Sequence, residues 1–185
     1  FKNLYVNELV FENEIKSIDF DLLKQFLDNN IYKIEKKIGK FVKNIVVIIN
    51  NEKILSLDLG IKKKNYNSLI NIKHLKSYIA EAKDLFEENY NSQKIMHIIL
   101  IKYLIDDKTS FLTEHNLRCD QISLEIQFKS LPINIADSFD KLLGNYQIKI
   151  NKFIDGNYLT KFLKNNNELS QMAHKILNGY NQKEV

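Results

Sequence analysis

Cysteine, proline, glycine and tryptophan are scarce in this sequence. Among 185 residues there are one cysteine, one proline, five glycines and no tryptophan. The single cysteine, Cys119, excludes an intrachain disulfide, so a reducing compartment is the default expectation. We find no internal repeat and no low-complexity linker, and the composition is that of a globular chain. The length suits one domain or two small lobes.

The sequence also lacks long apolar runs and the common catalytic motifs. No run approaches the roughly 18 residues that a membrane-spanning helix needs, and no signal peptide is visible. No GxGxxG, GxxxxGK[ST], GxSxG or HExxH pattern occurs. Because the chain starts at Phe1 inside a predicted strand, we expect it to be an excerpt of a longer protein, whose other motifs lie outside it.

The net charge is only mildly positive. There are 27 basic and 23 acidic side chains, which gives a formal charge of +4. This excess permits an acidic partner or an anionic membrane nearby but does not indicate nucleic acid. The basic run at residues 62–64 is predicted to be a solvated loop. The strand at 118–128 lacks the interleaved aromatic and basic residues of RNA-binding sheets, so we predict no nucleic-acid partner.

Hydrophobic periodicity predicts a mixed α/β chain of the α+β class. Strands are expected at residues 1–11, 42–49, 53–61, 94–105, 118–128 and 146–154, and helices at 19–38, 71–89, 134–143 and 168–177. Ser17 or Asp19 and, for the second helix, Asn71 are expected N-caps, and Gly39 is an expected left-handed C-cap. Asn50 and Asn51 are typical turn residues, so strands 42–49 and 53–61 are expected to pair as a hairpin.

The segment at 118–128 has the clearest alternation. One face carries Ile122, Leu124, Ile126 and Phe128, and the other carries Ser123, Glu125 and Gln127. This period of two predicts a strand with one buried and one exposed face.

The histidines, the cysteine and the paired carboxylates give weak chemical signals. The four histidines lie on different predicted elements without metal-ligand spacing, and His97 is expected to be a core or edge residue hydrogen-bonded to backbone. Asp106 and Asp107 could bind a metal, but adjacent side chains on an extended chain diverge, so a turn is favoured. Arg118 could lower the pKa of Cys119, yet an inert thiol is favoured because no histidine or asparagine partner is placed.

Residues 94–107 form the apolar stretch around which the neighbouring elements are expected to pack. In residues 95–107 the positions of His97, Tyr103 and the two aspartates coincide with those of a stretch in the FtsA family of bacterial cell-division proteins, in the actin/hexokinase-like ATPase superfamily. The helix at 19–39 leading into strand 44–49, the helix at 74–82 and the strand after Leu117 also resemble that family. The resemblance covers residues 19–159. Residues 50–53 lack the glycines of the family's turn, and residues 100–102 lack its proline.

The resemblance implies an organisation in subdomains. Residues 1–40 would belong to subdomain 1A, 41–131 to the SHS2-like strand-helix-strand-strand subdomain 1C, and 132–163 to a return to 1A, with 164–185 an unassigned helical tail. The family tethers the division ring to the inner membrane, and 1C is implied to mediate self-association and contacts with later divisome proteins. ATP is implied for the full-length family, but its phosphate-binding loops and amphipathic membrane helix match nothing here. No cofactor, metal or catalytic residue is therefore predicted on this segment.

The leading hypothesis is a non-enzymatic protein-interaction segment at the cytoplasmic face of the inner membrane, at the division site. Its implied partners are other FtsA subunits, divisome membrane proteins and, through parts outside this chain, the tubulin-like FtsZ and the membrane. The predicted contact residues are Asn50, Asn51, Glu52 and Lys53 at the hairpin tip, and Ser123, Glu125 and Gln127 on the polar strand face. Two alternatives stay open: a pilus-assembly ATPase of the same superfamily, and a small ligand-binding or enzymatic α/β module with a pocket around His97 and Tyr103.

Overall fold

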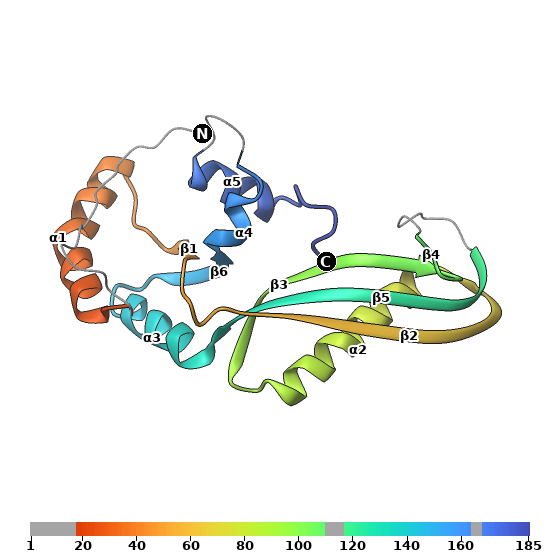
Figure 1. Ribbon diagram of the computed structural model, residues 1–185. Coiled ribbons are helices and arrows are strands. Elements are labelled where there is room, and N and C mark those ends of the chain that lie inside the picture. Colours follow the sequence, from red (N-terminus) through yellow and green to blue (C-terminus); the bar gives the residue numbers. More distant parts are fainter. Residues whose placement is uncertain (1–17, 110–116, 164–167) are drawn as a thin grey trace. The chain divides into compact units, whose positions relative to one another are not determined.

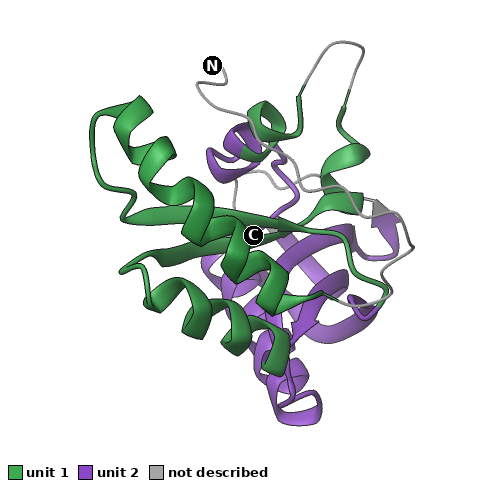
Figure 2. Cartoon of the chain, turned by 90° about the vertical axis from the view of Figure 1, so that its left-hand side faces the viewer, with its two compact units in different colours: residues 1–52, 134–173 green, residues 53–133, 174–185 purple. Residues whose placement is uncertain are grey.

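The computed structural model describes residues 18–109, 117–163 and 168–185 (Figure 1). The predicted strand at 1–11, with the proposed cap Ser17, and part of the predicted loop at 106–116 lie outside the described residues. The chain has helices and two sheets, one parallel and one antiparallel, which confirms the α+β class. It divides into two compact units (Figure 2): unit 1 comprises residues 1–52 and 134–173, and unit 2 comprises residues 53–133 and 174–185.

Unit 1 is built on two parallel strands. β1 (Asn44–Ile49) pairs with β6 (Lys149–Asp155), with a bulge between Ile45 and Val46. The helices of this part are α1 (Phe20–Ile38), α3 (Ile133–Gly144) and the short α4 (Gly156–Thr160); α5 (Leu169–Leu177) follows. Phe139 joins α3 to its surroundings through edge-to-face contacts, with ring centroids 5.1 Å from Phe20 and 5.8 Å from Phe153. Such aromatic pairs stabilise a core beyond the area that they bury.

The ends of α1 follow the predicted caps. Asp19 accepts hydrogen bonds from the amides of Asp21 and Leu22, both at 3.0 Å, and therefore satisfies two of the unpaired donors at the helix start. Gly39 ends the helix with φ 70°, a conformation that a side chain disfavours.

Unit 2 runs in the order β2 (Leu55–Ile70), α2 (Ile72–Asn89), β3 (Gln93–Ile105), β4 (Lys108–Thr109) and β5 (Leu117–Pro132), in which β4 has only two residues. Its antiparallel sheet has the order β2-β5-β3-β4. α2 lies along one face of the three long strands (Figure 1). That face carries the core cluster, in which Phe86 of α2 stacks on Phe128 of β5 with centroids 4.8 Å apart. The inward residues of β5 are those that the alternation predicted: Ile122, Leu124, Ile126 and Phe128.

The predicted hairpin of strands 42–49 and 53–61 is wrong. β1 pairs with β6 in one sheet, and β2 pairs with β5 in the other. The burial patterns give the reason: β2 alternates, as expected of a half-exposed antiparallel strand, whereas the near-continuous apolar run of β1 is typical of a parallel strand. Unit 2 starts at Lys53. The assignment of these ranges to subdomains 1A and 1C stays a prediction.

Two further boundaries differ from the prediction. Residues 62–64 are not a loop but continue β2 as far as Ile70, opposite residues 121–123 of β5. Lys63 is held there by Glu81 of α2, with Nζ 2.6 Å from Oε1. β5 runs on to Pro132, where the missing amide ends the ladder. Within the described ranges, no helix is both long and apolar enough to cross a membrane.

Candidate functional site

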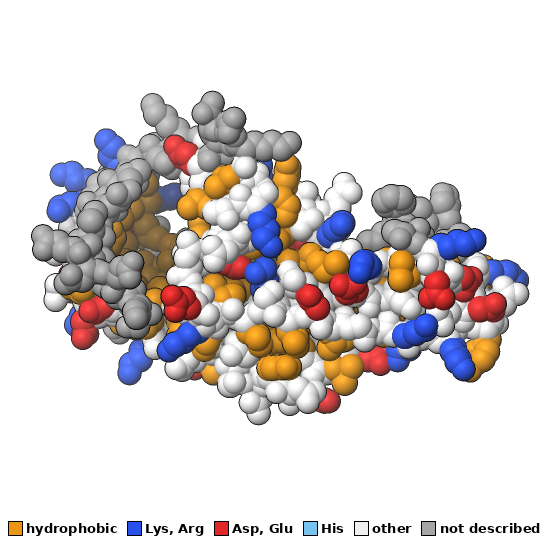
Figure 3. Space-filling model, in the orientation of Figure 1, with side chains coloured by type: hydrophobic (Ala, Val, Ile, Leu, Met, Phe, Trp, Pro, Cys, Tyr) orange, Lys and Arg blue, Asp and Glu red, His pale blue; other side chains and the backbone are white. Residues whose placement is uncertain are grey.

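The face of the unit 2 sheet that α2 does not cover is mostly polar around its middle. Alternation on the three long strands places Asp58, Gly60 and Lys62 of β2, Ser123, Glu125 and Gln127 of β5, and Lys102 of β3 on it. We call these seven residues the polar sheet face. The structure thus brings together the three predicted β5 residues. Charged side chains of both signs lie over the strands of unit 2 in Figure 3.

Cross-strand pairs connect these side chains. Gln127 donates from Nε2 to Asp58 Oδ1 at 2.9 Å, and Lys102 Nζ lies 2.7 Å from Glu125 Oε2. The hydrogen bond and the charge of Glu125 raise the pKa of Lys102, against a small opposing effect of desolvation. Because both members of this ion pair are substantially exposed, the pair orients side chains more than it stabilises the fold.

Gly60 leaves a hollow in the middle of the polar sheet face. A cavity of about 460 Å³ lies there, lined by Gly60, Ile61 and Lys62 of β2, Lys102 and Leu104 of β3, and Ser123, Leu124 and Glu125 of β5. A Cβ added at Gly60 would meet no atom within 4 Å, so the space is open. Two ammonium groups and one carboxylate at its rim suit a polar or acidic side chain of a partner. No nucleophile-base pair accompanies them in this rim.

The second predicted group, Asn50 to Lys53, does not form a hairpin tip. These residues connect β1 to β2, and they belong to both units, since Lys53 starts unit 2. Asn50 lies against the start of α4: a Cβ added at Gly156 would come 2.1 Å from its Oδ1. Glu52 and Lys53 are exposed and Asn51 is half-buried. Nothing in the structure tests the predicted contact role of this group.

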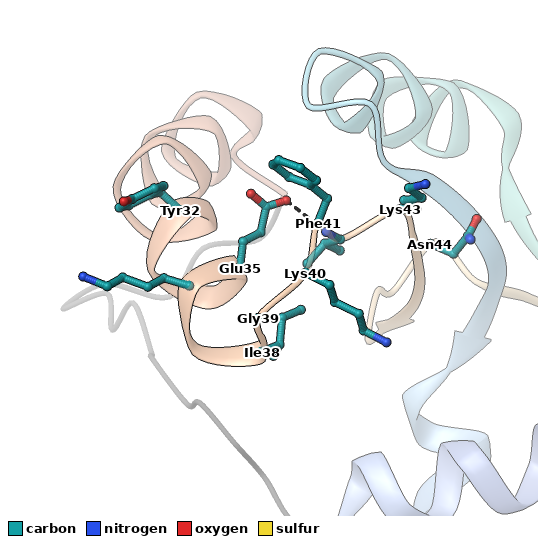
Figure 4. A pocket seen from close by; sticks show the side chains of 10 residues that line it. Tyr32, Glu35, Ile38, Gly39, Lys40, Phe41, Lys43 and Asn44 are labelled. Carbon is teal, nitrogen blue, oxygen red and sulfur yellow. Dashed lines mark hydrogen bonds between the residues drawn. The ribbon is translucent and has the colours of Figure 1, made fainter.

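Unit 1 has a hollow that the sequence did not indicate. A cavity of about 930 Å³ lies where α1 ends and the chain turns toward β1 (Figure 4). Its rim holds the exposed aromatic rings of Tyr32 and Phe41, while Glu35 accepts a hydrogen bond from the amide of Val42 at 2.9 Å. In the sequence, the only indication of this hollow was the position of Tyr32 and Phe41 on either side of the predicted helix end.

Asp106 and Asp107 have a turn role, as predicted. Both have positive φ, 48° and 61°, and they join β3 to β4 in a tight two-residue turn of type I′. Asp106 Oδ1 accepts from the amides of Asp120 and Gln121, both at 2.9 Å. Asp107 Oδ1 accepts from the side chain of Gln121 at 3.0 Å. The carboxylates are therefore engaged in holding the turn against β5.

Cys119 has an asparagine partner that the sequence did not indicate, and its predicted inertness stays a prediction. Its side chain is buried, and burial raises its pKa, against the opposing effect of Asn65, whose Nδ2 lies 3.5 Å from Sγ. The carboxylates of Asp106 and Asp120 raise the pKa further. Arg118 donates to the carbonyl of Asn67 at 3.4 Å.

His97 and Tyr103 do not line one pocket. His97 is 1% exposed, and its Nδ1 lies 2.9 Å from Glu184 Oε1. Tyr103 packs against the core cluster on the α2 side of the sheet, where burial raises its pKa. The predicted pocket of the ligand-binding alternative is therefore not formed by these two residues.

Comparisons with known proteins leave the family open. No family model matches the chain, and no significant match to a curated protein is found. Within the described residues, no group of three or more His, Cys, Asp and Glu side chains is placed to hold a metal ion.

Proposed function

We propose that this chain is a non-catalytic protein-interaction segment of an FtsA-like bacterial cell-division protein. The observation that supports the proposal is the order of the long elements of unit 2, β2, α2, β3 and β5, with the two-residue β4 between β3 and β5, α2 on one sheet face and polar side chains on the opposite face. That order is the one that the resemblance to subdomain 1C implies. The whole protein would act at the cytoplasmic face of the inner membrane, at the division site, and any ATP would be held by other parts of it.

The proposed contact surface is the polar sheet face together with the adjacent edge of β2. In the described part of the chain β2 pairs with β5 on one side, and its other side is a sheet edge. An exposed strand edge can add a strand from another molecule, while side chains on the face select which molecule. Other FtsA subunits and divisome membrane proteins are the proposed partners. Residues 50–53 are kept as a separate proposed contact group.

Charge reversal on the polar sheet face tests the proposal. We expect the double variant Glu125→Lys, Gln127→Lys to weaken self-association of the chain at least about tenfold in sedimentation velocity. The two new lysines would lie beside Lys62 and Lys102, so that the polar sheet face would carry charges of one sign. It should also fail to support division when introduced into the full-length gene. The matched control is Glu88→Lys on the exposed side of α2. Unchanged association and division in the double variant would refute the assignment.

A further inference from the structure

A short C-terminal segment lies along β3 in unit 2. Leu100 donates its amide to Lys183 O at 2.8 Å, and Val185 donates its amide to Ile98 O at 3.0 Å. Ile99 and Glu184 face each other between these bonds in an antiparallel bridge. We call residues 181–185 the edge segment. It adds a strand-like piece to the side of β3 that β5 does not occupy, and the C label lies beside β3 in Figure 1.

The edge segment places a carboxylate on a buried histidine. Glu184 faces Ile99, and the side chain two residues earlier on β3, His97, is its diagonal neighbour on the same face of the sheet. The Nδ1 to Oε1 distance is 2.9 Å, and the His97 side chain is fully buried. An imidazole in this position gives the edge a chemical preference, because a hydrogen bond to an ionised carboxylate is stronger than one between neutral groups.

The edge segment has little apolar attachment of its own. Lys183 is exposed and Val185 is 48% exposed, whereas Ile99 and Leu100 of β3 are buried. A short segment at a sheet edge with exposed side chains opens at a lower free-energy cost than the core strands. β4 pairs with β3 only at Leu104 and Ile105, so opening would uncover the backbone of residues 98–100.

We propose that the β3 edge at residues 97–100 is a strand-addition site for an extended segment of a partner protein that carries a carboxylate side chain opposite Ile99. The edge segment occupies this site within the same chain, and the partner displaces it. Main-chain hydrogen bonds to Ile98 and Leu100 would supply affinity, and a carboxylate on His97 would supply selectivity. The inference names a second surface and the chemistry of its partner, and it does not depend on the polar sheet face or on the cell-division assignment.

Peptide binding to the 185-residue chain tests the proposal. The probe is a fluorescent peptide with the sequence of residues 180–185, and the chain carries Glu184→Lys to weaken its own segment. Because the tethered segment competes at high effective concentration, we expect the peptide to bind the variant at least about tenfold more tightly than the unaltered chain. A peptide with Gln in place of its Glu should bind about tenfold more weakly. Glu88→Lys is the control and should bind like the unaltered chain.

Hydrogen exchange of the Leu100 amide gives a readout that is independent of the peptide. This amide donates to the edge segment, so Glu184→Lys should accelerate its exchange while amides that pair β3 with β5 keep their protection. Glu184→Gln, which preserves size, should act in the same direction. Unchanged Leu100 exchange, or peptide binding that ignores the peptide's carboxylate, would overturn the proposal. If the chain instead forms a dimer by exchanging edge segments, the occupant of the site would be a second copy of this chain. That result would also overturn the proposal.

Discussion

The two sheets of this chain use apolar residues differently. In unit 1, β1 and β6 form a parallel pair, and β1 is apolar on both faces. In unit 2 the strands are antiparallel and alternate, so that one face packs on α2 and the other presents polar side chains. In β1 only Ile49 is fully buried, and Ile48 is 36% exposed. The alternation in unit 2 leaves one polar sheet face free to bind, and the interaction surface is therefore proposed there.

Truncation of one core aromatic in each unit should have the largest effect on the free energy of unfolding. It tests most directly whether the two units have separate cores. Phe128 is fully buried on Phe86, and Phe139 lies between Phe20 and Phe153. Each change to alanine should lower the free energy of unfolding by about 3–5 kcal/mol. In hydrogen exchange, Phe128→Ala should expose amides of β2 and β5, and Phe139→Ala those of β1 and β6.

The control for both changes is leucine at the same position, which keeps most of the volume and should cost less. Equal loss of protection in both sheets after Phe128→Ala would contradict two separate cores, because it would mean that the chain unfolds as one cooperative unit.

Local patterns predicted the elements well because their causes are local. Asp19, Gly39 and Asn71 act as caps within a few residues of their own helices, and the predicted helix limits agree with α1 and α2 to within a residue. The alternation in β5 depends only on which face meets the core, so Ser123, Glu125 and Gln127 were placed together correctly.

The pairing of elements could not be predicted, because it depends on distant residues. The turn residues Asn50 and Asn51 suited a hairpin, but the partner of β1 is β6, which lies far along the chain. The partner carboxylate of His97 is 87 residues away. Residues 62–64 looked like a solvated loop because charge runs usually are; Glu81 and the ladder to β5 hold them in a strand instead.

A change at Gly156 in unit 1 should have a smaller effect whose sign depends on its neighbour. An alanine Cβ there would lie 2.1 Å from Asn50 Oδ1, so Gly156→Ala should destabilise unit 1 by about 1–2 kcal/mol. In an Asn50→Ala background the clash is absent, and the same change should be neutral or stabilising, because alanine favours helix. Urea unfolding of the four chains in this double-mutant cycle measures the coupling, and additive effects would show that the contact is not made.

At alkaline pH, ionisation of Tyr146 should lower the stability of unit 1. The hydroxyl of Tyr146 donates to Asp28 Oδ1 at 2.6 Å, and desolvation together with that carboxylate raises its pKa to about 12. Because the folded pKa lies above the unfolded value of 10.0, the protonated phenol contributes stability below about pH 10. That contribution is lost as the pH rises from there toward the folded pKa.

The check on Tyr146 is a tyrosinate absorbance titration of the chain and of Tyr146→Phe. The variant should lose a phenol that titrates near pH 12, and its unit 1 should lose less stability than the unaltered unit 1 over that interval. Tyr103, whose pKa is raised by burial in unit 2, stays in both chains and serves as the internal reference. If the titration curves of the two chains differ only by a phenol that titrates near pH 10, the interaction of Tyr146 with Asp28 is contradicted.

The smallest expected effect on stability concerns the polar sheet face itself. In a double-mutant cycle of Lys102→Met and Glu125→Gln, the coupling between the two exposed side chains should be smaller than that of Gly156 with Asn50, and should shrink as salt is added. A larger coupling that does not depend on salt would show that the charged side chains of this face stabilise the fold. Their presence would then be no argument for a binding partner. If the coupling is small while charge reversal at Glu125 and Gln127 still weakens association, the side chains of this face are of little use to the fold, and their arrangement around Gly60 is explained by what binds there.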